Sequence, residues 1–131
     1  PQETVEDFNL TLERLSELPL SQIHVFPYSI RPKTVAATMP CQVEQSEKHR
    51  RMQLVKDLSA KKHLEFLKNN IGAEYFVTIE KKPDRKTGMY KAVTPNYIKV
   101  FFEKTSKDSF VKIRLDEVDF ENEIMLGHIV S

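Results

Sequence analysis

The apolar residues near the start of the chain recur at helical spacing. Thr4 can cap the amino end of a helix, with Glu6 and Asp7 in the first turn, where acidic side chains complement the helix dipole. Four apolar residues share one face of this helix: Val5, Phe8, Leu12 and Leu15. Because Pro19 cannot continue a helix, the pattern predicts a helix that begins after Thr4 and ends before Pro19.

A second, longer helical pattern runs from Gln42 to about Asn70. Its apolar stripe consists of Leu54, Leu58, Ala60, Leu64, Leu67 and Ile71, and its lysines and arginines are expected on the solvated surface. Between the helices, Leu20 to Phe26 is short, rich in β-forming residues and bounded by prolines, which predicts a buried strand. The prolines at 27, 32 and 40 predict an extended, irregular connection over 27–40.

Beyond Gly72 the apolar residues alternate with polar ones, as they do in strands. The predicted strands are Tyr75–Ile79, Met89–Val93, Tyr97–Phe102, Phe110–Leu115 and Ile124–Val130, with a turn-rich connection over 82–88. Short strands at this density predict a small five-stranded antiparallel barrel, so the fold class is α+β.

The composition is that of a soluble globular protein. The chain has 131 residues, of which 40% are hydrophobic and 30% charged, and no apolar run approaches the roughly 18 residues of a membrane span. It opens on Pro1 with no signal peptide, so we expect a piece of a longer protein. A single cysteine, Cys41, precludes an internal disulfide and fits a reducing, cytoplasmic setting.

Positive charge is concentrated in the middle of the second half, although the net charge is only +1. The cations are Lys81, Lys82, Arg85, Lys86, Lys91, Lys99, Lys104 and Lys107, and Tyr90 and Tyr97 lie among them. Lysines that contact phosphates, beside aromatics that stack on bases, are typical of RNA-binding barrels. We expect RNA contacts from Lys81, Lys82, Arg85, Lys86, Lys91, Asn96, Tyr97 and Lys99. The alternative is an ordinary solvated face.

No local catalytic motif is present. Three glycines cannot build a phosphate-binding loop, and the four histidines lack metal-ligand spacing. We expect His24 to be buried in its strand, and Cys41 to be a small residue at a loop–helix junction. The loop after residue 26 is a better candidate, since a barrel strand delivers polar groups to its carboxyl-end rim. There Arg31 either binds an anionic ligand, or else caps a helix end or pairs with an acidic side chain.

Three segments carry a resemblance to a known family. His24–Ser29, in the context HVFPYSIRPKTVAA, and Gln2–Phe8, QETVEDF, resemble barrel segments of the radical-SAM tRNA methylthiotransferases. Thr94–Val100, TPNYIKV, resembles a strand of the TRAM domain, an OB-like RNA-binding barrel of that family. The resemblance implies the carboxyl-terminal α-β-α part of a radical-SAM barrel with a long linking helix over 1–71, and a TRAM barrel over 72–131.

The resemblance also implies the activity of the parent enzyme. Within the family, the HVFPYS segment looks most like the branch that methylthiolates N6-threonylcarbamoyladenosine beside the tRNA anticodon. Such an enzyme uses S-adenosylmethionine and two 4Fe-4S clusters, and the matching positions suggest cofactor contacts from Glu3, Phe26, Tyr28, Ser29 and Arg31. The partners implied are tRNA and the missing amino-terminal part of the same protein; the oligomeric state stays open.

The sequence departs from the family pattern in ways that bear on catalysis. Gln2, Lys33 and Ala92 stand where the family usually has glycine, and the cluster-binding CxxxCxxC is absent. Because such clusters need several thiolates, we expect this chain to be non-catalytic alone and to bind no cofactor. The alternatives are a non-catalytic module that binds RNA or protein, and a remnant without function.

Overall fold

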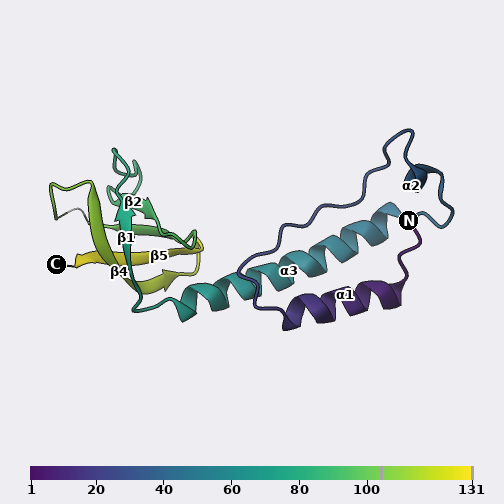
Figure 1. Ribbon diagram of the computed structural model, residues 1–131, viewed down its shortest axis with the longest axis horizontal. Helices are drawn as coiled ribbons and strands as arrows, with labels where there is room; N and C mark the ends of the chain where they lie inside the picture. The colour runs from purple at the N-terminus through teal and green to yellow at the C-terminus, as the bar shows by residue number, and fades with distance from the viewer. Residues whose placement is uncertain (104, 131) are drawn as a thin grey trace. The chain divides into compact units, whose positions relative to one another are not determined.

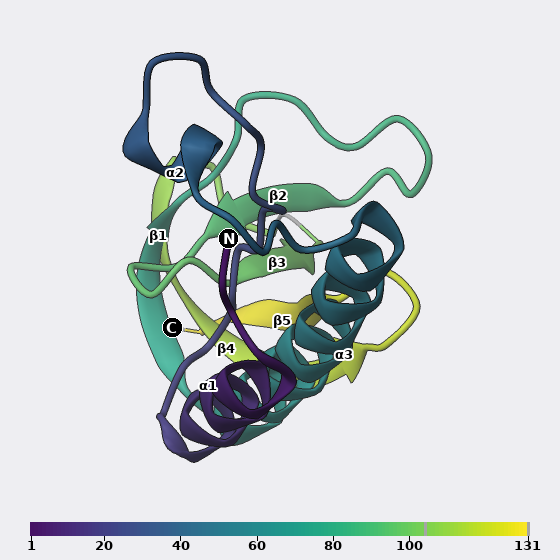
Figure 2. The same ribbon diagram turned by 90° about the vertical axis from the view of Figure 1, so that its right-hand side faces the viewer.

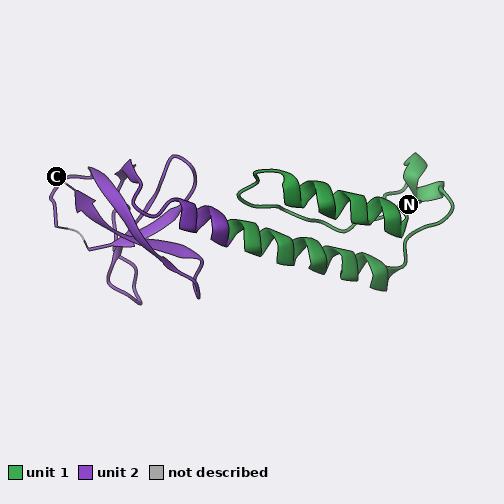
Figure 3. Cartoon of the chain, turned by 90° about the horizontal axis from the view of Figure 1, so that it is seen from below, with its two compact units in different colours: residues 1–63 green, residues 64–131 purple. Residues whose placement is uncertain are grey.

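The computed structural model describes residues 1–103 and 105–130, and the chain forms two compact units, residues 1–63 and 64–131 (Figure 3). Figure 1 labels the helices and most of the strands. Among the described residues, no helix has both the length and the apolar content that crossing a bilayer requires.

Helix α1 (Val5–Glu17) confirms the first predicted helix. The Thr4 hydroxyl accepts a hydrogen bond from the Asp7 amide at 3.1 Å, and the Asp7 carboxylate accepts from the Thr4 amide at 2.9 Å. This capping box satisfies two backbone donors that would otherwise lack partners. Phe8 is the buried residue of the helix.

The predicted strand over residues 20–26 is absent, which corrects the sequence interpretation. The segment is held instead by Ser59, whose hydroxyl accepts from the Ile23 amide at 2.8 Å and donates to the Ile23 carbonyl at 3.0 Å. Residues 1–63 contain no strand at all, so this segment has no partner with which it could form a ladder. Its side chains are consequently not all covered: Phe26 is 84% exposed, and His24, expected to be buried, is exposed.

The predictions for residues 27–40 and for the long helix need smaller corrections. Residues 27–40 are not wholly irregular, since they contain the short helix α2 (Val35–Thr38), which Thr34 caps through the Ala37 amide. Helix α3 (Gln45–Asn69) begins three residues after the predicted start at Gln42. Three polar residues of α3 are buried rather than solvated: Arg51, Ser59 and Lys62. They can be buried because each has hydrogen-bond partners.

Residues 64–131 form a five-stranded sheet with the strand order β1-β4-β5-β3-β2. The strands are β1 (Glu74–Thr78), β2 (Tyr90–Val93), β3 (Lys99–Phe102), β4 (Phe110–Asp119) and β5 (Ile124–Val130). All five predicted strands are present, but the sheet is mixed, because β3 and β5 pair in parallel. The expectation of a purely antiparallel barrel is therefore wrong.

The sheet curls into a half-barrel around a buried core, and Figure 2 shows the strands following one another in this order. The two edge strands approach each other, since the Glu80 amide after β1 donates to the Lys91 carbonyl of β2 at 2.9 Å. The core includes Leu67 from the end of α3 and, from the sheet, Val77, Val100, Phe102, Ile113, Leu115 and Met125. Burial of these apolar side chains is the main favourable term for this unit.

Candidate nucleic-acid interface

The outer face of β2, β3 and β5 carries the most concentrated group of predicted RNA contacts. Residues alternate across a strand, so Ala92, Val100 and Phe102, which are buried, leave their neighbours facing outward. The register places Lys91 opposite Phe101, and Phe101 opposite Leu126. Two rows of outward side chains follow from this pairing: Lys91, Phe101 and Leu126 in one, and Val93 and Lys99 in the next.

Two tight turns form walls above this face. In the first, one oxygen of the Asp84 carboxylate accepts from the amides of Lys86 and Thr87, both at 3.0 Å. In the second, Asp119 accepts from the amides of Glu121 and Asn122 at 3.0 and 3.1 Å. Together, the face and the turns enclose a pocket of about 480 Å³, which we call the outer-face pocket. Its lining includes Glu80, Asp84, Lys86, Lys91, Lys99, Phe101, Asp119, Asn122 and Leu126.

The charges of the outer-face pocket are mixed. Lys91 Nζ lies 3.8 Å from both Glu80 Oε2 and Asp84 Oδ2, and 5.8 Å from the centroid of the Phe101 ring. Hydrogen bonds from the backbone of Thr87 and Lys86 lower the pKa of Asp84, and those from Asn122 lower the pKa of Asp119. Both carboxylates are therefore negative near neutral pH, so this is not a uniformly basic surface.

The structure brings only some of the predicted RNA contacts together. Lys86, Lys91 and Lys99 line the outer-face pocket. Lys81, Lys82 and Arg85 lie exposed on the neighbouring loop and do not line the pocket. Lys104, which belongs to the same basic stretch of sequence, lies outside the described residues.

Asn96 occupies a structural position in the turn between β2 and β3. Its amide nitrogen donates to Asn70 Oδ1 and to the Tyr75 hydroxyl, both at 3.1 Å, and its Oδ1 accepts from the Thr94 hydroxyl at 2.6 Å. Both of its donors are thus used inside the unit, and only one lone pair of Oδ1 is left for an external partner.

The turn also holds Tyr97 in an unusual backbone conformation. Tyr97 has φ 67° and is 87% exposed. Its amide donates to the Thr94 carbonyl at 2.9 Å, which closes the turn. The left-handed region is costly for a bulky residue, and an exposed ring recovers little of that cost through burial. The ring is therefore available for stacking on a ligand.

In residues 1–63, three of the predicted cofactor contacts line a second pocket of about 380 Å³, which we call the helical-unit pocket. These are Glu3, Phe26 and Tyr28, whereas Ser29 and Arg31 are exposed and do not line it. The Tyr28 hydroxyl is buried and has no hydrogen-bond partner among the described residues. A buried hydroxyl of this kind could donate to a polar ligand.

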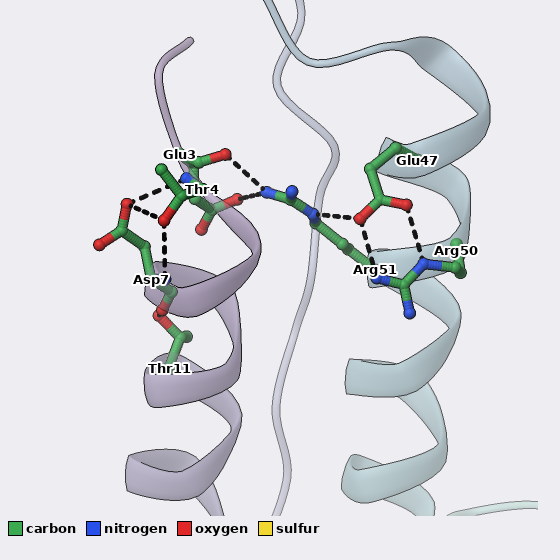
Figure 4. A network of polar contacts seen from close by, with 7 residues as sticks. All are labelled: Glu3, Thr4, Asp7, Thr11, Glu47, Arg50 and Arg51. Carbon is green, nitrogen blue, oxygen red and sulfur yellow. Dashed lines mark hydrogen bonds and ion pairs between the residues drawn. The ribbon is translucent and has the colours of Figure 1, made fainter.

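Glu3 is held by Arg51, a residue to which the sequence interpretation gave no role (Figure 4). Arg51 Nη1 donates to the Glu3 carboxylate at 2.7 Å and to its carbonyl at 3.1 Å, while Nε donates to Glu47 at 2.8 Å. Hydrogen bonds from Arg50 and Arg51 lower the pKa of Glu47 from 4.5 to about 2. The signal that could have found this network is the spacing of Glu47 and Arg51, one helical turn apart.

The chain does not provide a site for an iron–sulfur cluster. Cys41 is its one cysteine and is exposed, with φ 55°. Within residues 1–103 and 105–130, no group of three or more histidine, cysteine, aspartate or glutamate side chains could hold a metal ion. Because clusters of the 4Fe-4S type need several thiolates, the residues present do not fit one.

Comparison with known proteins identifies relatives over much of the chain, although no family model matches it. A threonylcarbamoyladenosine tRNA methylthiotransferase of Aquifex aeolicus is 40% identical over 74 residues, or 56% of this chain and 18% of that protein. A tRNA-2-methylthio-N(6)-dimethylallyladenosine synthase of Bartonella tribocorum is 35% identical over 116 residues, or 88% of this chain and 25% of that protein.

A second threonylcarbamoyladenosine tRNA methylthiotransferase, from Bacillus subtilis, is 33% identical over 120 residues, or 88% of this chain and 26% of that protein. The chain spans about a quarter or less of the length of these curated relatives. The relatives act, by their names, on two different modified adenosines, but all of them methylthiolate tRNA. The chain belongs to the radical-SAM tRNA methylthiotransferase family.

Proposed function

We propose that residues 64–131 bind tRNA for a methylthiotransferase of this family, as a TRAM-like domain in the carboxyl-terminal part of the cytoplasmic enzyme. The observation that carries the proposal is the gathering of Lys86, Lys91 and Lys99 around the outer-face pocket, with Lys91 and Lys99 in the sheet and Lys86 in the turn above it. Lys86 and Lys99, which are exposed, can attract the RNA backbone, and the exposed ring of Tyr97 offers a stacking surface in the adjoining turn. The tRNA-modifying relatives support the choice of tRNA.

The proposed substrate is a tRNA with N6-threonylcarbamoyladenosine beside its anticodon. The HVFPYS segment supports this choice, and relatives named for threonylcarbamoyladenosine and for dimethylallyladenosine both match the chain. Competition between tRNAs that carry one or the other modification tests the choice. The threonylcarbamoyl form should be bound more tightly by the enzyme that contains this chain.

The helical-unit pocket is proposed to contribute to the S-adenosylmethionine site of the complete enzyme. Its apolar walls suit the adenosine end of that cofactor, and so does the Tyr28 hydroxyl, which has no partner among the described residues. When bound, S-adenosylmethionine supplies the radical and the methyl group. Glu3 is already paired with Arg51, so its part is to position the start of α1. Ser29 and Arg31 do not line the pocket, so they would contact the cofactor only from the rim of the pocket.

Salt-dependent binding tests the RNA proposal. The affinity of the 131-residue chain for tRNA would be measured by fluorescence anisotropy at several salt concentrations, together with a Lys86→Gln/Lys99→Gln double variant. The matched control is Lys56→Gln/Lys61→Gln, which removes two exposed charges from α3. Each lost phosphate contact reduces the slope of log K against log salt by about 0.7 to 0.9.

We therefore expect the slope of the Lys86/Lys99 variant to fall by about 1.4 to 1.8, and that of the control to stay unchanged. Binding that is insensitive to salt, or equal loss in the two double variants, would contradict the proposal. In that case the sheet would serve as a module that docks protein.

A further inference from the structure

The outer-face pocket contains more acidic groups than a surface that binds only phosphates requires. Glu80, Asp84 and Asp119 line it together with Lys86, Lys91 and Lys99. Carboxylates repel a phosphate backbone, so three of them would weaken a surface whose only task was to hold a polyanion. The same groups are useful for a ligand that carries hydrogen-bond donors as well as a negative charge.

The floor of the pocket offers a surface for one flat ring. Phe101 lies between Lys91 and Leu126 in the sheet register, and all three side chains line the pocket. Phe101 is half-buried, so one part of its ring is fixed by the sheet while another part faces the pocket. A fixed aromatic ring stacks on a base at little entropic cost, and Lys91 already lies near the ring at 5.8 Å.

The three carboxylates are not equally available. Asp84 and Asp119 are committed to the hydrogen bonds of their turns, which makes them rigid parts of the wall. Among the described residues, Glu80 makes a long ion pair with Lys91, at 3.8 Å. Its carboxylate can accept hydrogen bonds from an incoming amino group without breaking a turn. Lys86 and Lys99, both exposed, are the cations available to a phosphate.

We propose that the outer-face pocket binds a single unpaired nucleotide of the RNA whose base carries an exocyclic amino group. Phe101 stacks on the base, Glu80 accepts from the amino group, and Lys86 and Lys99 hold the phosphate. A volume of about 480 Å³ is within the range of small-ligand sites. This inference rests on the proposed RNA binding and adds base selection to it.

Mononucleotides test the inference on the 131-residue chain itself. The probes are adenosine 5′-monophosphate and purine riboside 5′-monophosphate, which has a hydrogen atom in place of the amino group. Titration followed by NMR should show the adenine nucleotide binding at least about fivefold more tightly. Glu80→Gln should reduce that preference, because an amide offers a weaker acceptor than a carboxylate.

The stacking role is tested by a pair of matched variants. Phe101→Leu should weaken binding of adenosine 5′-monophosphate about tenfold, whereas Phe110→Leu should leave it unchanged, because Phe110 is 63% exposed and does not line the pocket. Circular dichroism would establish that both variants are folded. The comparison of the two nucleotides needs no variant, so it decides the matter even if Phe101→Leu unfolds.

Equal affinity for the two nucleotides, or no binding of either at about 10 mM, would overturn the inference. Equal effects of the two phenylalanine variants would also overturn it. After any of these outcomes the proposed tRNA binding would still hold, provided that the Lys86→Gln/Lys99→Gln variant still reduces the slope of log K against log salt. If the unmodified chain showed no salt-dependent tRNA binding, the proposed function would be refuted instead.

Discussion

Gly127 is the position at which one added methyl group should most disturb the sheet that carries the outer-face pocket. It lies in β5 opposite Leu115, next to the irregularity between Leu115 and Glu117. A Cβ at this position would meet the main-chain oxygen of Arg114 well inside van der Waals distance, and Val100 Cγ2 at 3.2 Å. Arg114 pairs with both neighbouring strands, so its backbone cannot retreat without breaking the ladder.

The expected cost of Gly127→Ala is about 3 kcal/mol in the free energy of unfolding, the upper end for overpacking, because the contact is with backbone. Gly88→Ala is the comparison. Its Cβ meets nothing within 4 Å, but its φ of +72° disfavours alanine, so we expect a loss of about 1 to 2 kcal/mol. Urea unfolding of the 131-residue chain, followed by circular dichroism and by tyrosine fluorescence, would measure both.

A stability of Gly127→Ala within about 1 kcal/mol of the unmodified chain, or a smaller loss than that of Gly88→Ala, would contradict this expectation. Either result would mean that β5 can shift away from β4 at the irregularity. The contact at Gly127 would then not be what fixes the register that places Leu126 beside Phe101.

Three further predictions concern other parts of the chain. Lys62→Met should lower the free energy of unfolding by about 2 kcal/mol, because the buried Lys62 ammonium donates to the carbonyls of Ser16 and Leu18. Thermal unfolding would measure the loss, with Lys61→Met, at an exposed site, as the control. The pKa of Glu47 is lowered from 4.5 to about 2, so its carboxylate stabilises the fold above pH 4.5 and loses this effect as the pH falls toward 2. Glu47→Gln should therefore make the free energy of unfolding depend less on pH between about 4.5 and 2. Tyr97→Asn should weaken tRNA binding about tenfold, because it removes the exposed ring. Since asparagine tolerates a φ of 67°, the free energy of unfolding should change by less than about 1 kcal/mol. A large loss of stability would contradict the assignment of the ring to ligand contact.

The sequence predicted the elements of residues 64–131 well, because local alternation of apolar and polar residues identifies a strand wherever its partner lies. It did not predict that β3 and β5 run parallel, since strand pairing between distant segments leaves no local signal. The predicted strand over 20–26 failed for the opposite reason. Its composition suits a strand, but residues 1–63 provide no second strand with which it could pair.

Charged residues were the least predictable part of the candidate sites. Arg51 and Lys62 looked like solvated cations in a helical pattern, yet both are buried, because Glu3 and the end of α1 supply acceptors. The basic stretch indicated the lysines of the outer-face pocket but not the carboxylates that the fold brings to them. Asp119 is distant in sequence from Lys91 and reaches the pocket only through the pairing of β3 with β5.

NMR mapping of the 131-residue chain with an anticodon stem-loop RNA would show directly which surface binds RNA. If the outer-face pocket binds it, the largest amide shift changes will occur at Lys91, Lys99 and Phe101, with smaller changes in the turn at Tyr97. Changes confined to residues 1–63, or to the face of β1 and β4 around Phe76 and Phe110, would contradict this assignment.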